Sequence, residues 1–445
     1  MKTPICDFVK TYAESGVLRA HMPGHKGVSL TGAEPRDITE VQGADVLYGA
    51  CGIIRESEEN ARDLFGSGAT FYSAEGSSLS VRAMLYLTLL YAKRQGRAPR
   101  ILAARNAHRV FITAAALLDL AVEWLFGEGD LLRCVVTPEA LEKTLSEADT
   151  PPAAVYITSP DYLGNVADVK ALAEVCHRYG VLLLVDNAHG AYLRFLPEDR
   201  HPLTLGADLC CDSAHKTLPV LTGGGYLHIS QNAPREMAAW AEDAMALFAS
   251  TSPSYLILQS LDAANGYLAD GYAPRLAAFA ERTAQLKARL VDHGYTLAGD
   301  EPLKLTVLTK PYGYEGCDLA ALLRDGDVEC EFSDPDHLVL MLTPALGEAG
   351  LARIETALCA VEKREAIMSP PPILPRPRVV TSPRAALLAP SVELPVDACV
   401  GRTLANPTVS CPPAVPILVC GEQIDEAALA CFRYYGIKTC LVVDE

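Results

Sequence analysis

The 445-residue sequence has no run of 18 apolar residues, and its first residues lack the apolar core of a signal peptide. Neither a membrane-spanning helix nor a secretory leader is therefore predicted, and we expect a cytoplasmic protein. Positive charge is also scarce, because 38 lysines and arginines stand against 55 aspartates and glutamates, which gives a net charge of −17. This balance argues against nucleic acid or an anionic membrane as a partner.

Cysteines are present, but they form no recognisable pattern. The 14 cysteines include no CxxC, and the adjacent Cys210 and Cys211 lie in an apolar, strand-like run. We interpret the cysteines as reduced core residues rather than as disulfides or metal ligands. The sequence also lacks internal repeats and low-complexity tracts, and half of its residues are apolar. A chain of this length and composition is expected to fold into two or three globular domains.

Short apolar runs alternate with amphipathic ones between residues 60 and 230. An apolar stripe from Val169 to Tyr179 predicts a helix that ends at Gly180. Strands separated by such helices indicate an α/β fold with a mostly parallel sheet covered on both faces, which binds ligands at the carboxyl ends of its strands. The predicted strands are 100–104, 122–126, 154–158, 181–186, 207–211 and 224–229.

The rest of the chain divides at changes in composition. Residues 256–293 are predicted to be largely helical, and the following region mixes strands at 303–309 and 338–342 with helices at 317–324 and 349–364. Five prolines within 369–377 indicate a stiff linker. The predicted divisions are an N-terminal segment (1–60), a large domain (61–290), a small α/β domain (291–368), and the linker with a C-terminal module (369–445).

The most informative motif is SAHKT at residues 213–217, about thirty residues after VDNAH at 185–189. The amine of Lys216 can form a Schiff base with an aldehyde, and its small polar neighbours can hold a phosphate. Asp186, at the end of an apolar strand, can keep a pyridine nitrogen protonated so that the ring withdraws electrons. Alone, Lys216 reads as a surface lysine and Asp186 as a helix cap. Together, in this order, they predict a pyridoxal phosphate site.

Two further segments suit the same cofactor. Gly76, Ser77 and Ser78 precede a predicted helix, whose exposed N–H groups and dipole favour phosphate, although an ordinary serine cap is the alternative. Ala188 and His189 follow Asp186, and the small alanine lets a cofactor ring lie against the backbone.

Three other segments have simpler interpretations beside the functional ones. His108 follows a strand and offers a flat ring to stack on a cofactor, with a structural histidine as the alternative. Thr251 and Ser252 lie in a hydroxyl-rich turn that, by sequence alone, only opens a helix. The motif HMPGHKG at 21–27 has two histidines but no acid at ligand spacing, so no metal site is predicted.

These motifs make the chain similar to the Orn/Lys/Arg decarboxylases of fold type I, in particular to their shorter bacterial form. HMPGHKG and the lysine motif are specific to the family, and the other segments support them. The resemblance implies a mostly parallel seven-stranded sheet in the large domain. The matching segments are HMPGHKG (21–27), GII (52–54), FG (65–66), RNAH (105–108), VDNAHG (185–190), SAHK (213–216), TSPSY (251–255), PPAVP (412–416) and GEQI (421–424).

The resemblance also implies roles for individual residues. Lys216 would hold pyridoxal phosphate as an internal aldimine, Asp186 would pair with the pyridine nitrogen, and His108 would stack on the ring. The family is dimeric or larger with its site between subunits, so a homodimer is implied. The phosphate contacts implied are Ser77, Ser78, Ser213 and His215, with Thr251 or Ser252 reaching it from a second subunit.

The implied reaction is decarboxylation of lysine, arginine or ornithine to an amine of polyamine metabolism. A basic substrate needs a carboxylate for its distal cation, and the candidates are Glu331 first, then Glu75 and Asp45. Residues 218–225 (LPVLTGGG) depart from the family's polar pattern after the lysine, so we interpret the departures as bearing on the substrate. Alternative functions are an aminotransferase or other lyase of the same fold, and a non-catalytic member retained as a binding or regulatory subunit.

Overall fold

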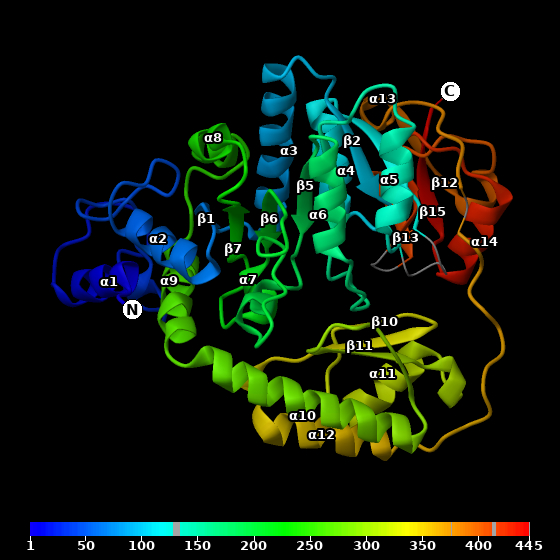
Figure 1. Cartoon of the computed structure of the whole chain (residues 1–445). Helices are drawn as coiled ribbons and strands as arrows, with labels where there is room; N and C mark the ends of the chain where they lie inside the picture. Colours follow the sequence, from blue (N-terminus) through cyan, green and yellow to red (C-terminus); the bar gives the residue numbers. More distant parts are fainter. Residues whose placement is uncertain (128–133, 375, 412–414, 445) are drawn as a thin grey trace. The chain divides into compact units, whose positions relative to one another are not determined.

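The computed structural model describes residues 1–127, 134–374, 376–411 and 415–444 (Figure 1). These residues form two compact units, one of Met1–Ala98 with Val169–Arg275 and one of Pro99–Asp168 with Leu276–Glu445. Position 375 of the predicted linker and positions 412–414 of the predicted C-terminal motif lie outside the described residues.

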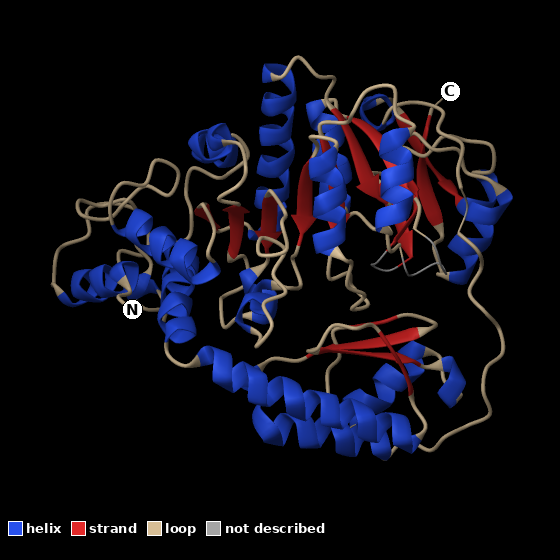
Figure 2. Cartoon of the chain, in the orientation of Figure 1, coloured by secondary structure: helices blue, strands red, loops and turns tan. Residues whose placement is uncertain are grey.

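The fold is α/β, as predicted, and its largest sheet has seven strands in the order β1-β7-β6-β5-β4-β2-β3 (Figure 2). The pairs β2–β3, β2–β4 and β5–β6 are parallel, whereas β7 is antiparallel to both β1 and β6. The prediction of a mostly parallel sheet is therefore confirmed. The first unit contributes β1, β5, β6 and β7, and the second contributes β2, β3 and β4.

In the first unit, β5 and β6 are buried along their whole length, as expected for central strands with apolar sequences such as LLLV. The helix predicted from Val169 ends at Arg178, and Gly180 adopts a φ of +63°, which suits a residue just past a helix end. The elements of this unit are α1 (Pro4–Glu14), α2 (Ile53–Phe65), β1 (Ala69–Ser73), α3 (Gly76–Arg94), α6 (Val169–Arg178), β5 (Leu182–Asp186), β6 (Leu209–Asp212), α7 (Ala214–Thr217), β7 (Gly225–Ile229), α8 (Arg235–Ala246) and α9 (Tyr255–Ala269).

The segment predicted to be largely helical from 256 to 293 is two helices. They break at Gly271, whose φ is +65°. The second of them, α10 (Tyr272–His293), runs beside α12 (Gly347–Cys359) in the second unit, where Arg289 forms a two-pronged ion pair with Glu355 (Figure 1).

The first part of the second unit contains β2 (Arg100–Ala104), α4 (Arg109–Leu118), β3 (Ala121–Leu125), α5 (Pro138–Ser146) and β4 (Ala154–Thr158). A four-stranded antiparallel sheet, in the order β10-β11-β9-β8, lies in the region predicted as a small α/β domain, which also contains α11 and α12. Its strands and first helix are β8 (Thr296–Ala298), β9 (Lys304–Leu308), α11 (Gly316–Asp325), β10 (Phe332–Ser333) and β11 (His337–Met341).

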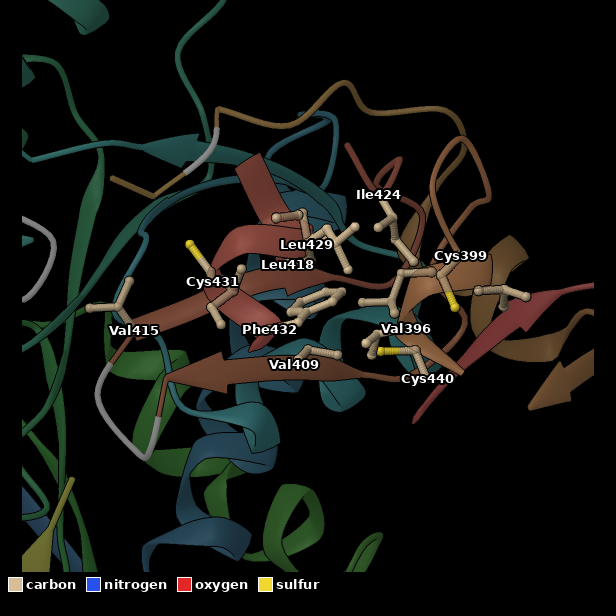
Figure 3. Close-up of a cluster of buried hydrophobic side chains, with 14 of the residues drawn as sticks. Val396, Cys399, Val409, Val415, Leu418, Ile424, Leu429, Cys431, Phe432 and Cys440 are labelled. Atoms are coloured by element: carbon tan, nitrogen blue, oxygen red, sulfur yellow. The ribbon is translucent and has the colours of Figure 1, made fainter. Parts of the chain in front are cut away.

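The C-terminal module supplies most of an apolar cluster that contains Phe432 and Leu418 (Figure 3), and Leu163 and Val339 from earlier in the chain complete it. Cys399, Cys431 and Cys440 lie buried in this core as free thiols, in agreement with the prediction of reduced core residues. That prediction is wrong for Cys51 and Cys317, which are exposed. The elements of the module are α13 (Pro383–Leu388), β12 (Ser391–Pro395), β13 (Thr408–Cys411), β14 (Val415–Val419), α14 (Glu426–Tyr434) and β15 (Thr439–Val443).

A buried ion pair connects this module to the end of β2. Arg105 Nη1 lies 2.7 Å from Glu422 Oε1, and Arg105 Nη2 lies 2.8 Å from Glu422 Oε2. Both side chains are almost completely inaccessible to solvent. None of the helices among the described residues has the length and apolar character needed to span a bilayer.

Candidate active site

Asp186 is the last residue of β5, and its side chain is buried at the carboxyl end of that strand. Its Oδ1 accepts a hydrogen bond from the N–H of Ala188 at 3.2 Å and lies 3.5 Å from the thiol of Cys211, which is its partner residue on β6. Burial and the neighbouring Asp186 carboxylate hold the pKa of the Cys211 thiol well above its usual value, so this thiol stays a hydrogen-bond donor.

Lys216 follows β6 in the short helix α7 and reaches back toward the segment after β5. Its Nζ lies 3.0 Å from Nε2 of His189, which is buried and three residues beyond Asp186. The predicted lysine and the segment that carries the predicted acid therefore meet within one unit of the protein. The carboxyl ends of neighbouring parallel strands bring them together, which is where ligands bind in such sheets.

The predicted phosphate residues also come together. The hydroxyl of Ser213 donates a hydrogen bond to Oγ of Ser77 at 2.8 Å, so the start of α3 and the turn after β6 meet. The N–H groups in the first turn of α3, which includes Ser78, have no carbonyl partner within their own helix and favour an anion. His215 Nδ1 lies 2.8 Å from the carbonyl of Gly224 and so lies against the glycine run rather than in solvent.

Main-chain atoms of the glycine run at 223–225 lie against the phosphate cradle, as we call the predicted phosphate residues Ser77, Ser78, Ser213 and His215. The N–H of Gly76, whose φ is +67°, donates to the carbonyl of Gly223 at 2.6 Å. A Cβ on Gly225 would lie 2.9 Å from the carbonyl oxygen of Asp212 and 3.1 Å from the nitrogen of Ser77, so only glycine fits there. An amine, a buried carboxylate and paired hydroxyls at a helix start are the donor set that pyridoxal phosphate requires, and the residues fit that cofactor.

Four predicted residues of the first unit lie outside this cluster of contacts. Thr251 and Ser252 are exposed in the single chain, and Glu75 accepts the N–H of the neighbouring Ser250 at 2.6 Å. Asp45 is buried, and its carboxylate accepts main-chain N–H groups at the start of α2, including that of Gly52 at 2.7 Å. Burial alone would raise the pKa of Asp45, but these hydrogen bonds hold it below its usual value. Its carboxylate therefore anchors α2.

Two predicted residues belong to the second unit. His108 is exposed and caps α4, because its Nδ1 accepts the N–H of Val110 at 3.2 Å. Glu331 is also exposed, and its Oε1 accepts a hydrogen bond from the hydroxyl of Tyr162 at 2.8 Å. In the 21–27 motif of the first unit, His25 lies 3.2 Å from Asp37 and accepts the N–H of Gly27.

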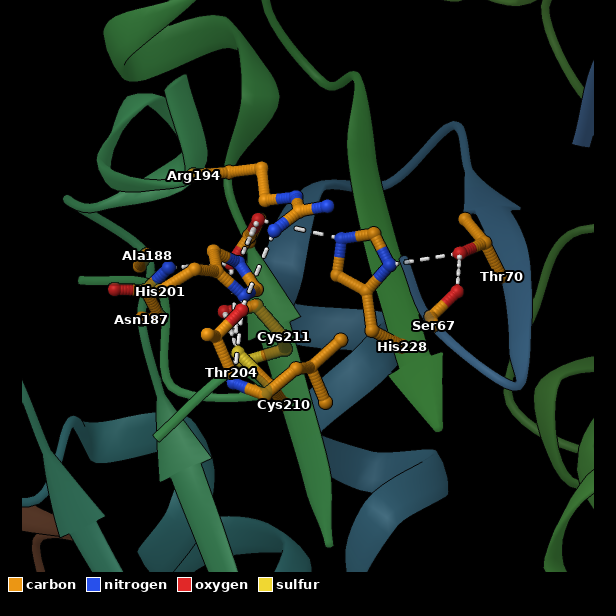
Figure 4. A network of polar contacts seen from close by, with 12 residues as sticks. Ser67, Thr70, Asn187, Ala188, Arg194, His201, Thr204, Cys210, Cys211 and His228 are labelled. Atoms are coloured by element: carbon orange, nitrogen blue, oxygen red, sulfur yellow. Dashed lines mark hydrogen bonds and ion pairs between the residues drawn. The ribbon is translucent and has the colours of Figure 1, made fainter. Parts of the chain in front are cut away.

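A network that the sequence did not predict lies beside Asp186. Asp212, the last residue of β6, contacts Asn187, His201 and His228, and all four side chains are fully buried. Figure 4 shows Asn187 and the two histidines. The position of Asp212 directly before SAHKT is the one sequence signal that pointed to it. Nothing local in the sequence marks the two histidines as its partners.

This fold is shared by the fold-type I pyridoxal phosphate enzymes. A lysine decarboxylase from Francisella novicida superposes with a TM-score of 0.79 at 16% sequence identity, covering 99% of this chain and 81% of that one. A serine palmitoyltransferase from S. paucimobilis, solved with bound PLP, superposes with a TM-score of 0.54 at 16% identity, covering 68% and 75% of the two chains. At these identities the likeness concerns the fold alone.

Sequence comparison is more specific. The profile of the family described as Orn/Lys/Arg decarboxylase, major domain, matches residues 3–294. An arginine decarboxylase of Halalkalibacterium halodurans is 29% identical over 97% of this chain and 93% of its own length. The chain thus belongs to the Orn/Lys/Arg decarboxylase family, as the sequence motifs predicted, and it is an amino-acid decarboxylase.

Proposed function

We propose that this protein decarboxylates a basic amino acid with pyridoxal phosphate bound to Lys216, and that it works as a homodimer or larger homo-oligomer. The observation that carries the proposal is the placement of the Lys216 amine against His189, three residues past the buried Asp186. Lys216, the strand-end acid Asp186 and the phosphate cradle lie in one unit, and membership of the decarboxylase family supports the proposal that they bind one cofactor.

Bound pyridoxal phosphate supplies an electron-accepting ring for the electron pair released when the bond between Cα and the carboxylate breaks. Asp186 holds a proton on the pyridine nitrogen, since a buried carboxylate favours a charged partner. Ser77 and Ser213 hold the phosphate through their hydroxyls. His189 orients Nζ of Lys216, which then returns a proton to Cα of the product. The resemblance assigns the face of the ring to His108.

The proposed substrate residue is Glu331, whose carboxylate is oriented by Tyr162 and is exposed. A guanidinium binds a carboxylate through two parallel hydrogen bonds, and a relative of this chain is named arginine decarboxylase. We therefore propose arginine as the first substrate to test, ahead of lysine and ornithine. Glu75 and Asp45 rank lower, because both already accept main-chain N–H groups.

The decisive experiment incubates the protein and pyridoxal phosphate with a panel of carboxyl-labelled amino acids. Release of labelled carbon dioxide with the matching amine supports the proposal, whereas a keto acid indicates an aminotransferase. Lys216→Ala is expected to abolish turnover while circular dichroism stays unchanged, and substantial residual activity would refute the role of Lys216. If wild-type protein develops no visible absorbance band when the cofactor is added, a non-catalytic role follows.

Glu331→Gln tests the substrate assignment separately. Loss of the carboxylate is expected to raise KM for the basic substrate, because the amide keeps the shape but not the charge. Glu348→Gln, at an exposed pair with Arg282 elsewhere in the second unit, is the control and is expected to leave KM unchanged. An unchanged KM for Glu331→Gln would remove Glu331 from the site.

A further inference from the structure

The buried carboxylate of Asp212 joins the ends of β5 and β6. Its Oδ1 accepts a hydrogen bond from the side-chain amide of Asn187 at 2.8 Å, and the N–H of Asn187 donates to the carbonyl of Cys211 at 3.0 Å. The side-chain oxygen of Asn187 is buried and accepts no hydrogen bond among the described residues. Asp212 is therefore what holds the orientation of the Asn187 amide.

Two histidines, His201 and His228, which are labelled in Figure 4, contact the other carboxylate oxygen of Asp212. Nε2 of His201 lies 3.0 Å and Nε2 of His228 lies 3.3 Å from Oδ2 of Asp212, and none of the three side chains is accessible to solvent. Burial alone would raise the pKa of the Asp212 carboxyl, but its contacts with His201 and His228 hold it below its usual value. Asp212 is thus a fixed negative charge inside the protein.

The network extends to the far strand of this unit. Nδ1 of His228 lies 2.8 Å from the hydroxyl of Thr70 on β1, and Thr70 in turn lies 2.7 Å from the hydroxyl of Ser67. Hydrogen bonds therefore link Ser67, Thr70 and His228, and the contact of His228 with Asp212 continues this chain of polar groups to Asn187, across β1, β7, β6 and β5. Such a chain fixes the side chains along it more firmly than single pairs do.

His201, Cys210 and Asp212 are also of the types that bind metals, and their ligand atoms lie within 4.8 Å of one another. The hydrogen bonds favour a different interpretation. The N–H of Leu203 points at Nδ1 of His201 at 3.4 Å, so Nδ1 carries the lone pair and Nε2 carries the proton that is donated to Asp212. A histidine in this tautomer is a donor to the acid.

We propose that Asp212 is a positioning residue for Asp186, acting through Asn187, which it holds directly after that acid in the chain. The inference rests on the proposed function, because it concerns the acid that would pair with the pyridine nitrogen. The titratable groups that face Asp212 are His201, His228, Cys210, Cys211 and Tyr226.

Asp212→Asn, Asn187→Ala and a matched control, Asp208→Asn, test this role. Asp208 is another buried acid, at the opposite end of β6, where it accepts the N–H of Leu183 at 2.8 Å and lies 3.1 Å from His177. Asp208→Asn therefore removes a charge of the same kind from the same strands, away from Asp186. Stability of the apoproteins in urea shows how much of each effect is structural.

The readouts are the Kd for pyridoxal phosphate and the pH midpoint of the visible absorbance of the bound cofactor. Asp212→Asn is expected to raise Kd at least about tenfold, which corresponds to about 1.4 kcal/mol, and to shift the pH midpoint. Asn187→Ala is expected to move both in the same direction, and it decides the outcome if Asp212→Asn does not fold. Asp208→Asn is expected to keep the wild-type Kd and midpoint.

The inference is overturned if Asp212→Asn and Asn187→Ala bind the cofactor as wild type does, or if Asp208→Asn shifts both readouts equally. Failure of the proposed function looks different, because then the wild-type protein itself would show no visible band on adding pyridoxal phosphate.

Discussion

Glu422→Gln is expected to weaken the attachment of the C-terminal module more than any surface change would. In the folded protein, the Glu422 carboxylate pairs with Arg105 through two hydrogen bonds and also accepts the N–H of Val419 at 2.8 Å. The Arg105 guanidinium lies over the rings of Trp124 and Phe126, at 5.1 and 5.5 Å from their centroids. Both side chains of the pair are therefore largely removed from solvent.

The expected loss follows from leaving a buried charge without its partner. The glutamine offers one acceptor oxygen and no charge, so Arg105 stays buried and cationic. Breaking a buried pair in this way costs about 3–5 kcal/mol of unfolding free energy. Replacing both partners by apolar residues of similar size, as in Arg105→Met with Glu422→Leu, is expected to restore most of that loss, because no buried charge remains.

The assay uses the position of the tryptophans, of which the sequence has two, Trp124 and Trp240. In a Trp240→Phe background, urea unfolding followed by fluorescence reports on Trp124 beneath Arg105. The control is Asp397→Asn, which breaks an exposed pair with Arg433 in the same module and is expected to cost at most about 0.5 kcal/mol. The reasoning is refuted if Glu422→Gln costs no more than this control.

Three other changes have definite expected outcomes. Asp186→Asn should lower kcat by about 100-fold or more, because a neutral amide no longer holds the ring nitrogen protonated, and wild-type kinetics would contradict the role of Asp186 as electron-sink partner. Gly225→Ala should lower the free energy of unfolding by about 1–3 kcal/mol and weaken cofactor binding, since its Cβ would lie 2.9 Å from the carbonyl oxygen of Asp212. A variant with the melting temperature and cofactor affinity of the wild type would show that the surrounding backbone can move to accept the methyl group. Glu58 is fully buried, and burial raises its pKa from 4.5 to about 8 despite the Tyr72 N–H and Arg55. Between these pH values the unfolded chain has released a proton that the folded protein keeps, so stability falls as pH rises, by about 1.4 kcal/mol per unit. Relative to wild type, Glu58→Gln should gain stability from pH 5 to 8 in urea titrations, and a gap independent of pH would contradict the buried neutral acid.

The structure brings together several of the residues that the local motifs selected, since Lys216 contacts His189 and Ser213 contacts Ser77. Lys216, Asp186 and Ser77 each lie at the end of a strand or the start of a helix, and these boundaries can be recognised from a few neighbouring residues. Once the strands are parallel neighbours, their carboxyl ends meet, so the contact between Lys216 and His189 follows from the order of the motifs. The antiparallel strand β1 was missed, because ATFYS is too short and too mixed to stand out from its surroundings.

Contacts between positions far apart in the chain could not be predicted from the sequence. Arg105 and Glu422 are 317 positions apart, and each reads locally as an ordinary surface charge. In the sequence, Asp212 likewise indicates that the strand before it has ended, because an aspartate is rarely buried in a strand unless it has a partner. The partners are His201 in a loop and His228 on an antiparallel strand, and only the folded sheet brings them to the same oxygen.

The structure shows which contacts are made by the glycines that follow Lys216, where the sequence departs from the family's pattern. Residues 218–225 replace the family's polar pattern, which suggested an altered substrate side. In the folded protein, the carbonyl of Gly223 accepts the N–H of Gly76, the carbonyl of Gly224 contacts His215, and Gly225 leaves room for Ser77. Through these main-chain contacts the glycines support the residues proposed to hold the phosphate. The proposed substrate residue Glu331, with its Tyr162 partner, lies in a different part of the sequence, and substitutions there test the choice of substrate separately.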